Sequence, residues 1–373
     1  MKVALVHESL TRLGGAERVL AEMHSIYPSA PIYALLHEDR VVQNLFPDAH
    51  VHLSFLRRFP EYVRKRERLF LPILPVVPET FDLSLYDVVI SSASAFAKGV
   101  VTRPGTLHIC YCHSPTRYLW DWYPQIFKEN SFGKFRGSLL AILLHYLRLW
   151  DQAAARRVDK FIANSKATQE RIRKYYGRDS EVIYPPVDVN KFKPTEKNEG
   201  YFLVVSRLSP YKRVDLAVNA FNKLEIPLVI VGEGRERQKL EKMSQKNIKF
   251  KGFVPDKELP EIYAGARALI FPGEDDFGIV PVEAMASGKP VIALKKGGAI
   301  ETIIPGVTGE FFEEPHEAIL AEVVRQFLEK EETYRTDLIR TQAEKFSKEN
   351  FRNKIISFVE KTWQEWEKSK FAS

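Results

Sequence analysis

Short runs of apolar residues recur along the whole chain of 373 residues and are separated by polar loops and helix-compatible segments. The first run, residues 3–6, leads through a break at 11–15 into helical spacing over 16–24, which is one β-α unit. Further runs in the first half are 31–36, 88–90, 107–110 and 161–163. Apolar runs that alternate with helical segments predict a parallel sheet covered by helices.

The same alternation is more regular in the second half of the chain. Five short apolar runs each lead into a loop and usually into a helix; they are 201–205, 227–231, 248–251, 268–271 and 290–294. They predict a second doubly wound α/β domain. A polar stretch after Pro185 and Pro186 separates the halves, so we expect domains at residues 1–192 and 193–348. The apolar side of a final helix, 349–373, has to dock, and we expect it on the first domain.

Composition and charge narrow the class of protein. With 45% hydrophobic and 28% charged residues, the chain is neither disordered nor fibrous. The net charge of +7 lies in residues 1–200, which hold 28 basic and 21 acidic side chains, whereas 201–373 hold 27 of each. The apolar run after Lys2 is too short for a signal peptide, and 139–144 is too short to span a bilayer. Cys110 and Cys112 are too close for an ordinary disulfide, so we expect a reducing, cytoplasmic location.

Two segments combine basic and apolar residues. The first has the cations Arg57, Arg58, Arg64, Lys65, Arg66 and Arg68, interleaved with apolar residues over 55–70. The second is 132–150, where Lys134 and Arg136 lead into an apolar helix. Both are typical of contact with an anionic membrane surface, which predicts a peripheral protein at the inner face of the cell membrane. The alternative is a core helix with a solvated basic face. No motif that reads nucleic acid is present, so we expect no nucleic-acid partner.

Loops after the strands are the places to look for a ligand site. Gly14 and Gly15 precede a helix whose N-terminus could hold a phosphate, although a plain turn explains them as well. Loop 206–213 carries Arg207 and Lys212, which suit a diphosphate, and its alternative is a solvated basic turn. Neither a G-x-G-x-x-G motif nor a P-loop occurs, which disfavours dehydrogenases and ATPases.

The loop and helix start at 272–286 are rich in carboxylates. Asp275 and Glu283 are eight positions apart and could both accept hydrogen bonds from the hydroxyls of a sugar or ribose. The alternative makes Asp275 and Asp276 charges at a helix N-terminus and Glu283 a helix surface residue. A fourth loop is 232–234 (GEG), and a fifth, polar one follows at 295–301. Five such loops at one sheet edge predict a shared ligand site.

These residues resemble the retaining nucleotide-sugar glycosyltransferases of family 4. The resemblance covers nearly the whole chain. Its most specific parts are Asp275 to Gly288 (DDFGIVPVEAMASG), Ser206-Arg207 with Lys212, and Asn164-Ser165 with Tyr184 to Asp188. It implies the GT-B fold, two Rossmann-like doubly wound α/β domains that face across a cleft. The chain departs from the family at Asp275, where the family has Glu, and this leaves Asp275 and Glu274 as alternatives for contact with the sugar.

The family's site residues carry over to matching positions. The resemblance implies that Arg207 and Lys212 bind the donor diphosphate, that Glu283 binds the ribose, and that His113 lies next to the transferred sugar. Further expected contacts with the donor are Asp275, the backbone of Phe277, Gly278, Ile279 and Val280, the opposite Gly14 and Gly15, and main-chain contacts of the base at Phe253 and Val254. His113, Arg207, Lys212 and Asp275 are the expected catalytic residues. From the sequence alone, His113 is equally a strand-end histidine satisfied by its neighbours.

The motifs look most like those of bacterial mannosyltransferases that build surface polysaccharides. The resemblance therefore implies transfer of a hexose, mannose from GDP-mannose, to a glycan or lipid-linked saccharide acceptor. It also implies retention of the anomeric configuration and no metal or other cofactor. Alternatives are a UDP-hexose-dependent transferase of the same fold and a non-catalytic two-lobed protein that binds a sugar or nucleotide. A glycan phosphorylase with pyridoxal phosphate would require a much longer chain.

Overall fold

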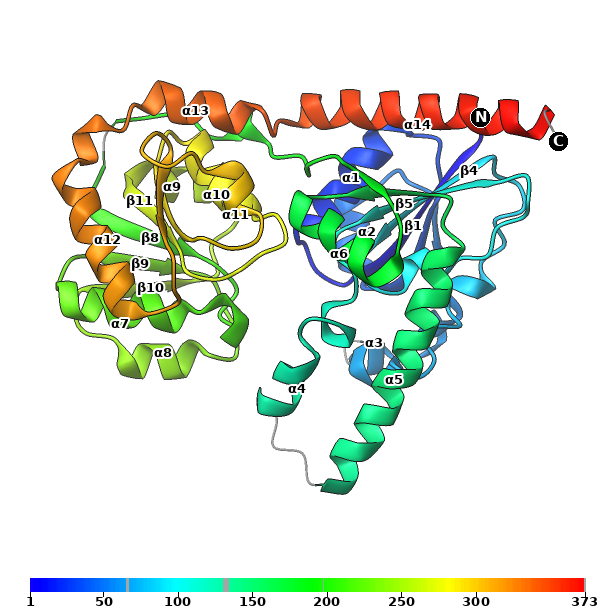
Figure 1. Cartoon of the computed structure of the whole chain (residues 1–373), viewed down its shortest axis with the longest axis horizontal. Coiled ribbons are helices and arrows are strands. Elements are labelled where there is room, and N and C mark those ends of the chain that lie inside the picture. Colours follow the sequence, from blue (N-terminus) through cyan, green and yellow to red (C-terminus); the bar gives the residue numbers. More distant parts are fainter. Residues whose placement is uncertain (65–66, 130–133, 197, 372–373) are drawn as a thin grey trace. The chain divides into compact units, whose positions relative to one another are not determined.

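The computed structural model describes residues 1–64, 67–129, 134–196 and 198–371. It divides the chain into two compact units (Figure 1). The first comprises Met1–Tyr184 and Arg352–Ser373, and the second comprises Pro185–Phe351. The C-terminal segment thus belongs to the same unit as the N-terminal half.

The first unit is built on a parallel sheet of seven strands in the order β3-β2-β1-β4-β5-β6-β7. The strands are β1 (Val3–Leu10), β2 (Ile32–His37), β3 (Val51–Leu53), β4 (Val88–Ala93), β5 (Leu107–Cys112), β6 (Lys160–Ala163) and β7 (Ser180–Val182). The predicted parallel sheet is confirmed. The strand order reverses between β1 and β4, which is where doubly wound sheets place ligands.

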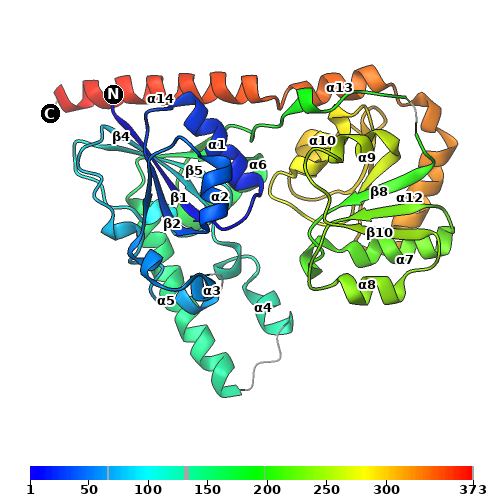
Figure 2. The same ribbon diagram turned by 180° about the vertical axis from the view of Figure 1, so that it is seen from behind.

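Helices cover both faces of this first sheet. They are α1 (Gly15–Ile26), α2 (Asp39–Leu45), α3 (Glu61–Arg64), α4 (Tyr123–Glu129), α5 (Lys134–Arg156), α6 (Lys166–Tyr176) and α14 (Lys348–Phe371). One face packs on α5 and α6 through Leu144, Leu147 and Ile172. On the other side α14 runs alongside α1, where Arg352 of α14 pairs with Glu22 of α1 (Figures 1 and 2).

The second unit has a six-stranded parallel sheet in the order β10-β9-β8-β11-β12-β13. Its strands are β8 (Tyr201–Val205), β9 (Leu228–Val231), β10 (Ile248–Gly252), β11 (Ala266–Phe271), β12 (Val291–Leu294) and β13 (Gly309–Phe312). Its helices are α7 (Val214–Leu224), α8 (Arg237–Met243), α9 (Leu259–Gly265), α10 (Ile279–Ala286), α11 (Ala299–Thr302), α12 (Glu317–Glu329) and α13 (Thr336–Glu344). One face of the sheet packs on α7, α8 and α12, and α9, α10 and α13 lie on the other (Figures 1 and 2). The predicted second doubly wound domain is confirmed.

The segment after Pro185 and Pro186 packs on the second unit. Val187 forms a parallel bridge with Ser347. Arg340 Nη1 donates to the carbonyl oxygens of Val189 at 2.7 Å, Phe192 at 2.9 Å and Ala286 at 2.7 Å. For this reason the compact units divide at residue 184, whereas the polar stretch in the sequence placed the division at residue 192.

Local signals set the ends of the helices. In α6, Ser165 Oγ accepts a hydrogen bond from the backbone N–H of Thr168 at 3.1 Å. At the other end, Gly177 has φ of 63°, a left-handed conformation that glycine adopts without strain. A serine N-cap and a glycine after the last turn therefore define the two ends of α6.

The two basic-apolar segments differ from the prediction in part. Arg64 does not belong to a surface patch, because it is buried and donates from Nη1 to the carbonyl of His37 at 3.0 Å. Leu56 and Phe70 also belong to the core. Lys65, Arg66 and Phe132 lie outside the described residues, as do the side chains of Arg68 and Lys134.

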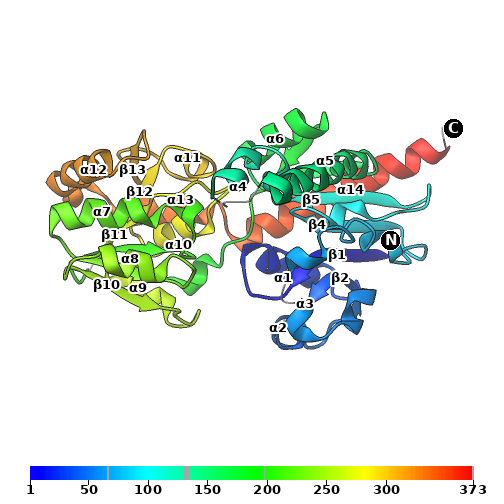
Figure 3. The same ribbon diagram turned by 90° about the horizontal axis from the view of Figure 1, so that it is seen from below.

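Part of α5 is exposed and apolar. The side chains of Phe135, Leu139, Ile142, Tyr146 and Leu149 are more than half exposed. Their spacing of four, three, four and three residues places them on one stripe of the helix. Figure 3 shows α5 next to α6, on the side of the first sheet opposite to α1 and α2. None of the described helices is long and apolar enough to cross a membrane.

Candidate active site

Two loops meet at the reversal of strand order in the second sheet. Loop 206–213 follows β8, loop 272–278 follows β11, and these two strands are neighbours. The loops are in direct contact, since a Cβ on Gly273 would lie 2.8 Å from the carbonyl oxygen of Lys212. Glycine at this position lets the two backbones approach, which brings the predicted cations and carboxylates together.

Lys212 and Asp275 form an ion pair across this reversal point. Lys212 Nζ donates to both carboxylate oxygens of Asp275 at 2.5 Å. The side chains are 17% and 23% exposed, so solvent reaches the pair only in part. Two residues that were predicted to bind different parts of a donor are thus partners of each other.

Arg207 lies on the surface of the same loop. Its Nη2 donates to the hydroxyl of Tyr211 at 2.6 Å, and its guanidinium lies 5.7 Å from the centre of the Tyr211 ring. Lys212 Nζ lies 5.3 Å from the same ring. Tyr211 therefore holds both cations at one end of the loop. The sequence analysis did not single out Tyr211, although it stands between the two predicted residues.

The helix N-terminus beside this pair belongs to α10. Gly278, with φ of 85°, precedes the first helical residues Ile279 and Val280, and no side chain caps the helix. The first backbone N–H groups of an α-helix have no partner within the helix, so those of Ile279 and Val280 suit an anion. Phe277, which precedes Gly278, is buried. Asp275 lies just before this helix N-terminus, and no acidic residue stands in the first turn of the helix.

Glu283 points into the protein from the middle of α10. It is 5% exposed, and its Oε2 accepts a hydrogen bond from the hydroxyl of Tyr263 at 2.8 Å. The alternative of a helix surface residue is therefore wrong. Tyr263, on α9, fixes the carboxylate and was missed by the sequence analysis, because an aromatic residue at helical spacing is ordinarily part of the core.

The remaining loops complete the same edge of the second sheet. A Cβ on Gly232 would lie 1.9 Å from the carbonyl oxygen of Ser206, and Gly232 N donates to the carbonyl of Gly252 at 2.8 Å. Gly298 N donates to the carbonyl of Asp275 at 3.0 Å. Four of the five loops that the sequence analysis grouped lie together at this edge, whereas the fifth, at Gly14 and Gly15, belongs to the first unit. Phe253, just after β10, is 76% exposed, and Val254 next to it is half-buried.

Gly14 precedes α1 in the first unit, and Gly15 is the first residue of that helix. A Cβ on Gly14 would lie 2.8 Å from Glu17 Oε2. The carboxylate of Glu17 thus lies against the turn and explains the glycine without a ligand. An acidic group at this helix start also opposes a phosphate there, so the geometry favours the plain-turn alternative for Gly14.

His113 follows β5, at the carboxyl edge of the first sheet, and is half-buried. Its Nε2 lies 2.8 Å from Ser92 Oγ, and Ser92 Oγ lies 3.1 Å from Nδ1 of His7. Burial, with a further contribution from His7, lowers the pKa of His113 to about 3. The imidazole is therefore neutral near pH 7. Its buried neighbours His7 and Glu17 were not predicted, although His7 was visible at the end of an apolar run.

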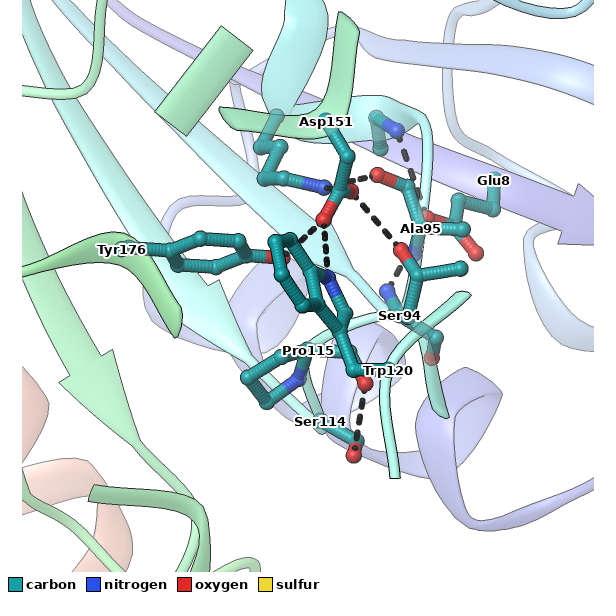
Figure 4. A network of polar contacts seen from close by, with 11 residues as sticks. Glu8, Ser94, Ala95, Ser114, Pro115, Trp120, Asp151 and Tyr176 are labelled. Atoms are coloured by element: carbon teal, nitrogen blue, oxygen red, sulfur yellow. Dashed lines mark hydrogen bonds and ion pairs between the residues drawn. The ribbon is translucent and has the colours of Figure 1, made fainter. Parts of the chain in front are cut away.

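A buried acid organises the loop after His113 (Figure 4). Asp151 of α5 accepts hydrogen bonds from Thr116 Oγ1 at 2.8 Å, Trp120 Nε1 at 2.8 Å, Tyr176 at 2.9 Å and Lys98 Nζ at 2.6 Å. Burial alone would lower the pKa of Lys98, but Asp151 outweighs it and raises that pKa. A carboxylate with four donors holds residues 114–120 in one conformation.

Glu8, on β1, organises the neighbouring loop after β4. Its Oε1 accepts backbone N–H groups of Ser94 at 2.9 Å and Ala97 at 3.3 Å, and also that of Ala95 (Figure 4). Burial raises the pKa of Glu8, and the N–H donors oppose this rise only in part. Buried acids thus fix the loops after β4 and β5, and His113 follows β5. Within the described part of the chain, no three His, Cys, Asp or Glu side chains are grouped to hold a metal ion.

Comparisons with known proteins define the class. The solved structure of Anabaena Alr3699/HepE in complex with UDP matches 97% of this chain and 100% of that chain, with a TM-score of 0.72 and 20% identity. Sucrose-phosphate synthase from Thermosynechococcus elongatus matches 97% and 99%, with a TM-score of 0.72 and 16% identity. With the two parallel sheets, these likenesses show the GT-B fold. The chain is a glycosyltransferase of this fold.

Two family models identify the family. Glycosyltransferase Family 4 matches residues 13–191, and Glycosyl transferases group 1 matches residues 187–345. The chain belongs to the family 4 glycosyltransferases, as the sequence resemblance indicated.

Curated relatives include mannosyltransferases. Human alpha-1,3/1,6-mannosyltransferase ALG2 is 26% identical over 334 residues, which are 79% of this chain and 76% of that protein. The GDP-mannose-dependent alpha-mannosyltransferase of Mycobacterium tuberculosis is 34% identical over 172 residues, 43% of this chain and 45% of that protein. The uncharacterized glycosyltransferase MJ1178 of Methanocaldococcus jannaschii is 28% identical over 226 residues, 58% of this chain. That match spans 63% of the archaeal protein's length.

Proposed function

We propose that this protein transfers mannose from GDP-mannose to a glycan or lipid-linked saccharide acceptor, with retention of configuration and without a metal ion. The printed activities of the human and mycobacterial relatives support the sugar, and the mycobacterial name supports the nucleotide. The observation that carries the chemistry is the arrangement of Arg207, Lys212 and the α10 N-terminus at one reversal point of the second sheet.

The reaction breaks the bond between C1 of the sugar and the diphosphate oxygen. Positive charge grows on the sugar ring, and negative charge grows on the leaving phosphate. Arg207, Lys212 and the N–H groups of Ile279 and Val280 supply preorganised positive charge for that phosphate. Removing a single donor of this kind in other enzymes lowers kcat by about 10²- to 10³-fold.

Donor binding exchanges the partner of Lys212. The ammonium of Lys212 lies 2.5 Å from the carboxylate of Asp275. The donor diphosphate replaces Asp275 as the partner of the Lys212 ammonium. Asp275 then accepts hydrogen bonds from the sugar hydroxyls. Glu283, held by Tyr263, accepts from the ribose hydroxyls, and the backbone at Phe253 and Val254 contacts the base. In the first unit, His113 contacts the transferred sugar.

A donor panel tests this function. Purified protein is incubated with labelled GDP-mannose, UDP-glucose and other nucleotide sugars, with an acceptor mixture and with EDTA present or absent. We expect transfer or hydrolysis of GDP-mannose that EDTA does not reduce, and NMR of the product should show the configuration of the donor. Turnover of UDP-glucose in its place would support the UDP-hexose alternative. Silence with every nucleotide sugar, with Lys212→Ala and Glu283→Ala no different from the parent, would refute the function.

For the acceptor side we propose contact with an anionic membrane surface. The exposed stripe on α5 supports this, together with exposed Phe59, Tyr62 and Leu69, which lie near the exposed cations Arg57 and Arg58 in sequence. Apolar side chains next to cations fit the interface of anionic lipid.

Vesicle sedimentation tests the membrane contact. We expect binding to phosphatidylglycerol vesicles, weaker binding to phosphatidylcholine, and loss of binding in Leu139→Ser/Ile142→Ser. Leu85→Ser is the matched control, because Leu85 is also exposed in the first unit but lies outside both segments. Equal sedimentation of all three proteins with both lipids would contradict the proposal.

A further inference from the structure

A chain of three buried side chains ends on His113. Glu17, in the first turn of α1, lies 3.8 Å from Nε2 of His7. His7 Nδ1 lies 3.1 Å from Ser92 Oγ, which lies 2.8 Å from Nε2 of His113. Glu17, His7 and Ser92 are 6%, 2% and 1% exposed, so water does not compete for these contacts.

The parallel sheet itself fixes this chain. His7 on β1 and Ser92 on β4 are directly paired in the sheet register. Glu17 reaches the same point from the first turn of α1, and its carboxylate lies against Gly14, where a Cβ would be 2.8 Å from Oε2.

The hydroxyl of Ser92 has one proton to donate. It can donate to only one of the two histidines, and it accepts a hydrogen bond from the other. If His7 carries its proton on Nε2, then Nδ1 of His7 accepts from Ser92, and Ser92 accepts from an Nε2–H of His113. If His7 carries a proton on Nδ1, every bond reverses and His113 carries its proton on Nδ1. The tautomer of His7 therefore decides the tautomer of His113.

Glu17 selects between these two states. A carboxylate near Nε2 of His7 favours a proton on that nitrogen. Burial would raise the pKa of Glu17, but its contact with His7, its backbone N–H donor and, more weakly, Arg12 outweigh burial, so that the pKa is lowered. The other acid near His7 is Glu8, the next residue on β1. The carboxylate of Glu8 accepts hydrogen bonds from the backbone N–H groups after β4.

We propose that Glu17, acting through His7 and Ser92, fixes His113 in the tautomer with its proton on Nε2 and presents Nδ1 as a hydrogen-bond acceptor. Within the described residues, no hydrogen bond engages Nδ1 of His113. An acceptor nitrogen selects a ligand group that donates, which suits a hydroxyl of the transferred sugar. It also places no N–H dipole against the positive charge that grows on the ring. This chemical use rests on the proposed function, whereas the tautomer itself does not.

Glu17, His7 and Ser92 are positioning residues, and the test reads the tautomer directly. The full chain is labelled with ¹⁵N-histidine, and two-bond ¹H–¹⁵N correlations report whether each ring nitrogen carries a proton. In the parent protein we expect a protonated Nε2 and an unprotonated Nδ1 on His113, with His113→Gln providing the assignment. In Glu17→Gln and in Ser92→Ala we expect the Nδ1 signal of His113 to move towards the protonated position.

Glu22→Gln is the matched control. Glu22 is a second buried acid of α1, but its ion pair is with Arg352. The Glu22→Gln variant should leave the ¹⁵N signals of His113 unchanged. A protonated Nδ1 in the parent, or a Glu17→Gln spectrum identical to that of the parent, would overturn the proposal. If either Glu17→Gln or Ser92→Ala fails to fold, the parent spectrum and the spectrum of the other variant still test the tautomer assignment.

Kinetics separate this inference from the proposed function. With an active donor, Glu17→Gln should lower kcat by about 10- to 100-fold and change the donor KM less than about twofold, since the tautomer matters at the reacting sugar. If no donor turns over while the NMR shows the expected tautomers, the proposed function fails and the tautomer assignment stands. If a donor turns over and Glu17→Gln changes neither kcat nor the spectrum, the tautomer assignment fails alone.

Discussion

Replacing Lys212 by methionine tests the chemistry of the second unit most directly. The substitution removes the ammonium and keeps most of the length of the side chain. It leaves Asp275 without the cation that lies 2.5 Å away in the parent protein. The donor phosphate loses one of its proposed positive groups, so we expect kcat to fall about 10²- to 10³-fold, or about 3–4 kcal/mol in activation free energy.

The same substitution has a separate effect on stability. The two side chains are 17% and 23% exposed, which places this pair between a surface pair and a buried one. Surface pairs contribute about 0–1 kcal/mol, and breaking a buried pair by removing one partner costs about 3–5 kcal/mol. We therefore expect Lys212→Met to lower the free energy of unfolding by about 1–2 kcal/mol.

A double variant separates the two effects. In Lys212→Met/Asp275→Asn no charge remains unpaired, so most of the lost stability should return, whereas activity should not. Urea unfolding measures the first quantity, and initial rates over a range of donor concentrations measure kcat and KM. Lys223→Met is the matched control, because Lys223 of α7 also pairs with a carboxylate, that of Glu317 at 3.2 Å. If Lys212→Met retains kcat within about twofold of the parent, the ammonium does not meet the leaving phosphate.

Three further predictions concern other parts of the molecule. Tyr263→Phe removes the 2.8 Å hydrogen bond to the buried Glu283, and we expect donor KM to rise about three- to tenfold in initial-rate assays and the unfolding free energy to fall by about 1–3 kcal/mol. Gly298→Ala places a Cβ 2.2 Å from the carbonyl oxygen of Phe277, and we expect a fall of about 2 kcal/mol or more in unfolding free energy, which urea titration would show. Burial lowers the pKa of His108 to about 3, below its unfolded value, so its stability contribution is complete above about pH 6.5 and lost below it. Stability should fall by about 1.4 kcal/mol per pH unit for this group between pH 6.5 and 4, and His108→Gln should show a shallower fall.

The central strands were predictable because each contains an uninterrupted run of apolar residues. The run 201–205 matches β8 at both ends, and 88–90 and 107–110 lie inside β4 and β5. The strands β3, β7 and β13 were missed. They have three or four residues each, lie at the edges of their sheets and show no clear alternation. A short edge strand forms because it can pair with the neighbouring strand of the sheet. The local sequence does not contain information about that neighbour.

Site residues were predictable where one loop carried several polar side chains. Contacts between site residues from distant parts of the chain were not predictable. Lys212 and Asp275 were named, but their ion pair depends on two loops 63 residues apart. Arg64 was assigned to the surface because its neighbours in sequence are basic, whereas the carbonyl of His37 holds it inside. The contact of Glu17 with His7 likewise depends on the packing of α1 on the sheet, so no spacing rule shows it.

The return of α14 to the first unit has a consequence for engineering. The backbone passes from one unit to the other after residue 184 and again after residue 351. Cutting the gene once therefore cannot yield both halves intact, since an isolated 1–184 fragment would lose the helix that Arg352 ties to Glu22. A circular permutant that starts at Pro185 and joins Ser373 to Met1 through a linker would make each unit a continuous stretch. Such a chain has a single crossing between units, so either half can be produced and titrated with ligand independently.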